Sequence, residues 1–284
     1  MRRTIAVLMA ILLLALASCS DSSSNDVPEV LKLGVPPGEA DPTMMEGVEA
    51  VGVLIEEATG IPVEVTETSD YLGIVEAMRS ELLDVALFSP MPTVLAESVA
   101  DTETLAVVLG APYTSNIICH PDAEVTELAD VADHSMAFVD PGSTSGNFIP
   151  RLMLQEAGVD LDSLNSTFAG GHDVAAIGVQ RGSTDCAAVA SLLLPMLVDS
   201  GTISDSDFEV IAESDTLPIS LTVIARGGLS DEITEQITDH LIETQAPSLL
   251  ELSRGAEIVA ADDADWTLFY DAAEELDIEL EDVE

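Results

Sequence analysis

Basic side chains are almost absent from this sequence. Its 284 residues include 53 Asp and Glu but only 8 Lys and Arg, which gives a formal net charge of −45 at pH 7. Because nucleic acid is bound through clustered Lys and Arg, this shortage excludes it as a partner. A surface this acidic stays soluble in concentrated salt, where charge repulsion is screened, and indicates a halophilic or salt-tolerant source.

Aromatic residues and cysteines are also scarce. Aromatic residues make up 4% of the chain, so aliphatic side chains must build the core. Apart from Cys19, the sequence has Cys119 and Cys186, and neither lies in a CxxC or metal-ligand spacing, so we expect no metal or cofactor. In an exported chain these two form one disulfide or remain as two buried thiols, and the sequence leaves both alternatives open.

The sequence has a single long apolar run, from Ile5 to Ala17, and the absence of a second one excludes a polytopic membrane protein. Two arginines precede the run and the lipobox-like "LASC" ends at Cys19, so we expect a secretory signal over 1–18. Lipidation of Cys19, with a flexible tether over 19–29, would anchor the exported protein to the outer face of the cell membrane. The alternative is an unlipidated signal with an incidental cysteine.

Short apolar runs alternate with helical patterns from Val30 onward, which predicts parallel sheets covered by helices on both faces. We expect helices over 43–59, 70–82, 145–157 and 173–181, then a long helix capped by Ser230 and a last one through "WTLFYDAAEEL". Asp70 is likewise placed to cap its helix. The strands are too many for one doubly wound sheet and a purely helical end follows Arg226, so we expect two α/β lobes with the C-terminus returning to the first.

The stretch "FVDPGSTSGNFIPRLML" (138–154) joins an expected strand to a helix through a turn rich in hydroxyls. Ser143, Thr144 and Ser145 precede Gly146 at the helix start, where unpaired N–H groups and the helix dipole favour an anion. One such hydroxyl is typical of a helix cap, but three in succession exceed what capping needs. The turn therefore predicts an anion site at the carboxyl end of a strand.

Two further loops place polar side chains at a helix start. In "FAGGHDVAAIGVQRGSTDCAAV", His172 precedes a helix and is able to donate a hydrogen bond to an oxyanion, although a lone loop histidine is more often incidental. In "TSDYLGIVEAM", Tyr71 stands in the first turn of a helix. Because ligands of open α/β sheets bind at the carboxyl ends of strands, we expect the three loops to converge on one cleft.

Together with "DYLGIVEAMRSELLDVALFSPMPTVLA" and "LKLGVPPGEADPTM", these stretches resemble the phosphonate- and phosphite-binding proteins of ABC importers, the PhnD-like family of type II periplasmic binding proteins. The most specific part is the D-P-x-S-T-S-G run followed by A-G-x-H-D. The resemblance implies two α/β lobes that close on a ligand through a hinge. The first lobe would comprise 30–113 plus 222–284, and the second 114–221.

The resemblance also implies the ligand contacts, which would come from Tyr71, Tyr113, Ser143, Thr144, Ser145 and His172. Many members have an aspartate where Ser220 stands, an acid that accepts a hydrogen bond from a protonated ligand oxygen. Ser220 therefore leaves the protonation state and the identity of the ligand open. Binding is expected to depend on N–H groups, hydroxyls and His172 rather than on an arginine.

The expected function is capture of a small phosphorus oxyanion (phosphonate, phosphite or phosphate) by lobe closure and its delivery to an ABC permease. We expect a monomer that is not an enzyme and touches the membrane through its lipid anchor alone. Alternatives are a sulfonate or a thiamine-precursor pyrimidine in the same clamp, and a sensory ectodomain. An exported hydrolase is the rival class, but no G-x-S-x-G, HExxH or metal-ligand cluster is present in the sequence.

Overall fold

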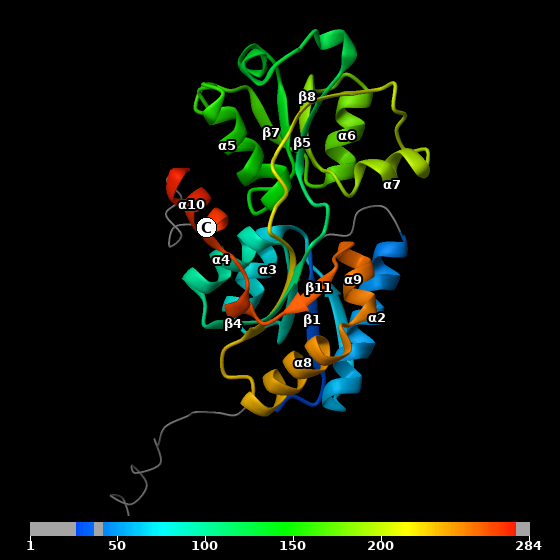
Figure 1. Cartoon of the computed structure of the whole chain (residues 1–284), viewed down its shortest axis with the longest axis vertical. Coiled ribbons are helices and arrows are strands. Elements are labelled where there is room, and N and C mark those ends of the chain that lie inside the picture. Colours follow the sequence, from blue (N-terminus) through cyan, green and yellow to red (C-terminus); the bar gives the residue numbers. More distant parts are fainter. Residues whose placement is uncertain (1–26, 37–41, 277–284) are drawn as a thin grey trace, which may run out of the picture.

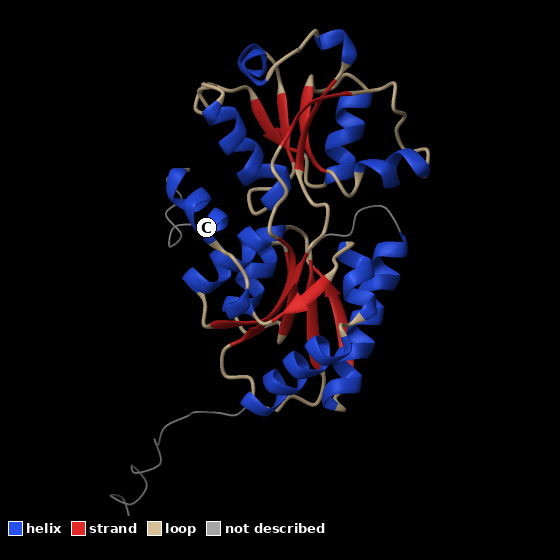
Figure 2. Ribbon diagram, in the orientation of Figure 1, coloured by secondary structure: helices blue, strands red, loops and turns tan. Residues whose placement is uncertain are grey.

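The computed structural model describes residues 27–36 and 42–276, which form two α/β lobes, one above the other (Figure 1). Each lobe has a sheet with helices packed around it (Figure 2). The expected signal over 1–18, Cys19 and most of the 19–29 tether lie outside the described residues. Within those residues, no helix combines the length and apolarity needed to cross a bilayer.

The first lobe contains a six-stranded sheet in the order β11-β4-β10-β3-β1-β2. Its strands are β1 (Leu31–Val35), β2 (Val63–Glu67), β3 (Val85–Phe88), β4 (Thr102–Leu109), β10 (Ile219–Arg226) and β11 (Glu257–Val259). β1 runs parallel to β2 and β3, whereas β10 runs antiparallel to β3 and β4. The prediction of a parallel sheet is wrong at this point, because the chain re-enters the sheet from the other lobe and therefore runs in the opposite direction.

The second lobe contains a five-stranded sheet in the order β7-β6-β8-β5-β9. Its strands are β5 (Ser115–Cys119), β6 (Met136–Phe138), β7 (Ser166–Phe168), β8 (Cys186–Ala190) and β9 (Glu209–Glu213). This sheet is mixed as well, since β5 runs antiparallel to β8 and β9. Two segments, 110–114 and 214–218, connect the lobes, and the second one leads into β10 at Ile219.

Helices cover both sheets (Figure 1). Those of the first lobe are α2 (Pro42–Thr59), α3 (Tyr71–Arg79), α4 (Pro90–Val99), α8 (Asp231–Thr244), α9 (Pro247–Ser253) and α10 (Thr267–Glu275). Those of the second are α5 (Ile149–Glu156), α6 (His172–Gln180) and α7 (Leu194–Asp199), with a π-helical turn η3 (Thr144–Phe148) before α5 and short 3-10 turns η1 (Pro121–Ala123) and η2 (Leu128–Asp133). Asp70 caps α3 by accepting the Gly73 N–H, whereas Ser230 stands at the start of α8 without a side-chain capping bond, contrary to expectation.

The sequence predicted a purely helical C-terminal part, and this prediction is wrong. After α9, the short strand β11 pairs with β4 at the sheet edge, and the 3-10 turn η4 (Ala261–Asp263) leads to α10. A strand of three residues is too short to show an alternating pattern in the sequence. α10 then packs against α4 of the first lobe and α5 of the second, so the end of the described chain contacts both lobes.

A disulfide stabilises the second lobe, and an apolar cluster holds the two lobes together. Cys119 of β5 and Cys186 of β8 stand opposite each other and form a disulfide, one of the two alternatives that the sequence left open. The largest apolar cluster includes Phe88 from the first lobe, Phe148 from the second and Phe269 from α10. The lobes are therefore in apolar contact, and this cluster extends to the pocket between them, since Tyr113 and Ala190 belong to both.

Candidate functional site

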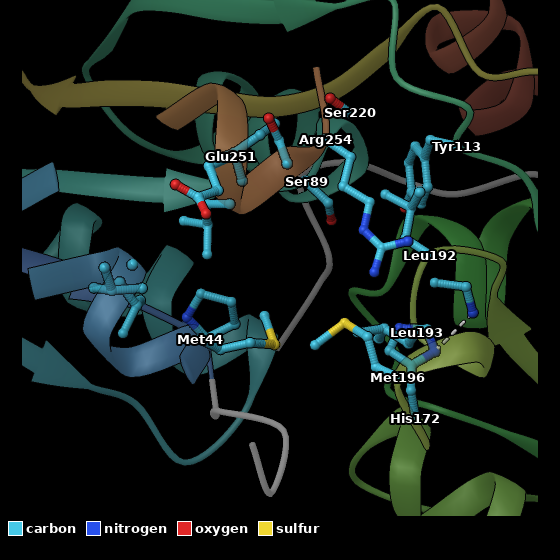
Figure 3. A pocket seen from close by; sticks show the side chains of 18 of the residues that line it. Met44, Ser89, Tyr113, His172, Leu192, Leu193, Met196, Ser220, Glu251 and Arg254 are labelled. Carbon is cyan, nitrogen blue, oxygen red and sulfur yellow. Dashed lines mark hydrogen bonds between the residues drawn. The ribbon is translucent and has the colours of Figure 1, made fainter. Parts of the chain in front are cut away.

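A pocket of about 720 Å³ lies between the lobes (Figure 3). It brings together most of the side chains that the sequence singled out: Tyr71, Tyr113, Ser143, Ser145, His172 and Ser220. They come from the ends of strands and the starts of helices in both lobes, which is where α/β sheets bind ligands. Thr144 is not among the residues that line it.

The hydroxyl-rich turn after β6 is held by its own hydrogen bonds. The Asp140 carboxylate accepts the Gly142 N–H at 2.8 Å, and the Ser143 hydroxyl accepts the Gly146 N–H at 3.1 Å. Ser143 thus caps the helix and lines the pocket at once. Gly146 leaves no room for a side chain, since a Cβ there would lie 2.4 Å from Val139. The turn opens into the π-helical η3, a distortion found frequently at functional sites.

Ser145 links this turn to the segment that crosses between the lobes. Its carbonyl accepts the Ser115 hydroxyl at 2.6 Å, while its side chain and backbone hydrogen-bond the phenol of Tyr113. Burial raises the pKa of Tyr113 to about 12, and the bonds to Ser145 oppose this rise. Tyr113 is therefore a neutral phenol at physiological pH, and its position is set before a ligand arrives.

His172 begins α6 and is 3% exposed. Its Nδ1 accepts the backbone N–H of Ala190 at 3.1 Å (Figure 3), so the ring proton of the neutral imidazole lies on Nε2. Burial lowers the pKa of His172 to about 3, which keeps the ring neutral at physiological pH. The pocket therefore contains a neutral imidazole whose remaining nitrogen is a hydrogen-bond donor.

Thr144 lies behind the pocket and joins the two lobes. Its hydroxyl accepts the N–H of Met91 at 2.9 Å and donates to the hydroxyl of Ser89 at 3.0 Å. Met91 is in the first turn of α4, so a residue of the second lobe satisfies a helix N-terminus of the first. The sequence predicted Thr144 as a ligand donor, whereas the structure uses its hydroxyl between the lobes; Ser89, its partner, lines the pocket.

Tyr71 also lies where the lobes meet. Its backbone N–H donates to the Asp140 carboxylate, and its ring packs against the apolar cluster of the second lobe. Gly142 allows this approach, because a Cβ there would come within 2.9 Å of the Tyr71 Cβ. Desolvation raises the pKa of Asp140, and the N–H groups of Gly142 and Tyr71 oppose that rise.

The wall from the first lobe has a different composition. Ser220 stands at an irregularity of β10, between Ile219 and Leu221, and its hydroxyl donates to the Val108 carbonyl at 3.3 Å. α9 brings Glu251 and Arg254 to the pocket, and sequence reasoning missed both. Arg254 lies beyond 226, where the family resemblance is weak, so the resemblance gave no signal for it. Its one sequence signal was that basic residues are scarce in this chain. Apolar side chains also line the pocket: Met44, Met45, Leu192, Leu193 and Met196.

Two α/β lobes joined by two crossing segments, with a pocket of polar and apolar side chains between them, define a clamp-type binding protein. Within the described ranges, no group of three or more His, Cys, Asp or Glu side chains is arranged to hold a metal ion. The chain belongs to the phosphonate-binding family of periplasmic substrate-binding proteins of ABC transporters, whose family model matches residues 33–266.

Individual relatives agree with this family. The phosphate-import protein PhnD of Mycolicibacterium smegmatis is 29% identical over 255 residues, which is 82% of this chain and 79% of that protein. The phosphonates-binding periplasmic protein of Escherichia coli K12 is 25% identical over 65% of this chain and 57% of its own length. PhnD1 of Prochlorococcus marinus, solved with methylphosphonate, matches 88% of this chain and 99% of its own with a TM-score of 0.77 at 16% identity.

The solved structures establish the fold as that of the type II periplasmic binding proteins. The family consists of substrate-binding transport proteins that act outside the cytoplasm, with a small ligand and a membrane permease as their partners. The sequence resemblance predicted this family, and the match of the family model to most of the chain confirms it.

Proposed function

We propose that this protein captures a small phosphorus oxyanion, either a phosphonate, phosphite or phosphate, between its lobes and delivers it to the permease of an ABC importer. The single observation that supports the ligand class most is the wall of the second lobe. Ser143, Ser145 and His172 line the pocket, are each no more than 3% exposed, and are already positioned by hydrogen bonds. A tetrahedral anion with several oxygen acceptors fits such a set of donors.

The wall suits an anion because its donors need little rearrangement. A hydroxyl can rotate to donate a hydrogen bond without any change in its protonation state. The neutral imidazole of His172 keeps its Nε2 proton over the whole physiological pH range. These groups lie at the N-terminal ends of η3 and α6, where the helix dipole favours negative charge. Short-range donors in a desolvated cleft are effective even in a chain with a net charge of −45, because salt screens the distant acidic surface.

The name of the M. smegmatis relative gives phosphate as the imported ligand, and that of the E. coli relative gives phosphonates. The pocket accommodates more than a bare ion, since its apolar side chains leave room for an alkyl substituent on phosphorus. We further propose that the protein is a monomer anchored through a lipid on Cys19, which would keep it close to its permease.

The test is a thermal-shift panel with inorganic phosphate, phosphite, methylphosphonate and methanesulfonate, run in low and in high salt. A ligand that binds the folded state alone raises the melting temperature, and more so as its concentration exceeds Kd. We expect shifts with one or more phosphorus oxyanions that exceed the shift with the sulfonate. Shifts with the sulfonate alone, or turnover of a phosphonate ester by the purified protein, would contradict the proposal.

A further inference from the structure

Among the described residues that line the pocket, Arg254 is the only Arg or Lys. It stands at the C-terminal end of α9, and Figure 3 shows its side chain extending into the pocket, while the Glu251 carboxylate lies on the other side of α9. With so few basic residues in the chain, a cation at this place is unexpected on composition alone.

Other basic side chains are engaged elsewhere in the structure. Arg79 pairs with Glu76 on the surface of α3 at 2.7 Å, and Arg226 pairs with the buried Asp84 at 2.9 Å. Arg151 lies 5.8 Å from the ring centre of Phe138. Over 27–36 and 42–276, by contrast, no carboxylate lies within ion-pair distance of Arg254. Its guanidinium is therefore available to an anion that enters the pocket.

The backbone fixes where Arg254 stands. Arg254 has a left-handed conformation (φ 51°), and Gly255 after it packs so closely on β4 that a Cβ would lie 2.1 Å from a Val108 methyl. The next N–H, of Ala256, donates to the Leu109 carbonyl at 2.8 Å. Because the Ser220 hydroxyl donates to the carbonyl of Val108, Arg254 and Ser220 are anchored to the same end of β4. Together they form the polar part of the first-lobe wall.

We propose that Arg254 completes the anion site from the first lobe, binding the ligand held by Ser143, Ser145 and His172, and that it makes the pocket prefer the doubly charged form of the ligand. The inference deepens the proposed function and depends on it. A guanidinium only donates hydrogen bonds, so each proton lost by the ligand gives it a further acceptor and a stronger Coulomb attraction. Ser220 adds no negative charge that would favour a protonated ligand oxygen.

The titratable and charged groups around the pocket come from several elements. They are Glu46 of α2, Tyr71 of α3, Tyr113 of the crossing segment, His172 of α6, and Glu251 and Arg254 of α9. His172 and Tyr113 hold one protonation state between pH 6 and 9, since their pKa values are about 3 and about 12. Arg254 remains a cation throughout this range. The second ionisation of a phosphonate or phosphate falls in it, whereas a sulfonate has none.

The experiment is isothermal titration of the full chain with methylphosphonate, inorganic phosphate and methanesulfonate at pH 6 and pH 9. The variants are Arg254→Gln, Arg254→Lys and, as a matched control on the surface, Arg79→Gln. We expect wild-type affinity for the phosphorus ligands to rise with pH while that for the sulfonate stays level. Arg254→Gln should weaken binding at pH 9 by about tenfold or more and flatten the rise. Arg254→Lys should keep part of the rise, and Arg79→Gln should behave as wild type.

The outcomes separate the two proposals. Unchanged affinity and an unchanged pH profile in Arg254→Gln overturn the role of Arg254 and leave the proposed function intact. A rise of equal size with methanesulfonate shows that protein groups titrate instead, and overturns the preference for the doubly charged ligand. If wild-type protein binds neither phosphorus ligand at either pH, the proposed function and this inference fall together.

Discussion

The two walls of the pocket differ in how much of the site exists before a ligand arrives. In the second lobe, Ser143, Ser145 and His172 are buried, and each is hydrogen-bonded to another residue of that lobe. In the first lobe, Ser220 is half-buried, Arg254 is exposed, and the guanidinium has no carboxylate partner among the described residues. From this difference we infer that the second-lobe wall is a preformed receptor for the anion, and that the first-lobe wall is completed when the lobes close on the ligand.

The two lobes are held together by an apolar contact and a hydrogen bond. The cluster around Phe88, Phe148 and Phe269 keeps the lobes in contact beside the pocket, and the hydroxyl of Thr144 adds a polar link to α4. We expect closure to be a rotation about this contact rather than an approach of two separate bodies. In such a rotation the first-lobe wall would move, while the second-lobe wall would keep its internal hydrogen bonds.

The largest effect is expected from breaking the disulfide that supports the second lobe. Cys119 and Cys186 are 67 residues apart, and opening a loop of that length lowers the free energy of unfolding by about 4 kcal/mol. Denaturant unfolding of oxidised and reduced protein measures it. The control is the variant Cys119→Ala/Cys186→Ala, in which the reductant should have no effect. Equal midpoints for oxidised and reduced wild type would show that this lobe does not depend on the bond.

We expect His172 to make the free energy of unfolding depend on pH. Its folded pKa of about 3 is below the unfolded value of about 6.5, so its stabilising contribution is complete above pH 6.5 and is lost as the pH falls toward 3. At pH 4.5 the loss is about 3 kcal/mol. His172→Gln lacks this term, so its unfolding free energy should fall less between pH 7 and 4.5. Parallel curves for the two proteins would mean that the imidazole is not held neutral by burial.

Removing the imidazole should also weaken ligand binding. His172→Ala deletes a buried donor of the rigid wall, and we expect the affinity for the best phosphorus ligand to fall by about 100-fold. His120→Ala is the matched control, because His120 also accepts a backbone N–H on its Nδ1, at 3.1 Å, but lies outside the pocket. Titration calorimetry of both variants is the measurement. Equal affinities would remove His172 from the site.

The smallest effect is expected at the link between the lobes. Thr144→Val keeps the shape of the side chain but leaves the N–H of Met91 without its partner, which should cost about 1 kcal/mol of stability. Thr244→Val, at an exposed hydroxyl on α8, should cost less. Ligand affinity should change far less than in His172→Ala. A loss of affinity as large as that of His172→Ala, with stability unchanged, would return Thr144 to the ligand-binding wall.

The second-lobe wall could be predicted from sequence because its parts are local. Three hydroxyls in succession at a helix start, and a histidine directly before another helix, show their chemistry without knowledge of their neighbours. What the sequence could not show is which hydroxyls line the pocket. Thr144 turns toward α4, and that depends on contacts more than 50 residues away along the chain.

The first-lobe wall could not be predicted from the sequence, because its parts are brought together by contacts between distant segments of the chain. Arg254 reaches the pocket because β11 pairs with β4 at the far edge of the sheet and Gly255 packs on Val108. Neither a three-residue strand nor a close glycine contact leaves a periodic signal in the sequence. The mixed direction of both sheets was missed because antiparallel pairing is set by the two crossings between lobes.

The most direct test of the account is a crystal structure of the protein with bound methylphosphonate or phosphate. We expect the phosphorus oxygens within hydrogen-bond distance of Ser143, Ser145 and Nε2 of His172, with the second-lobe wall unchanged and Arg254 brought to the anion from the other side. An anion that is bound elsewhere, or that contacts the first lobe alone, would contradict the central claim that the second lobe is the preformed receptor.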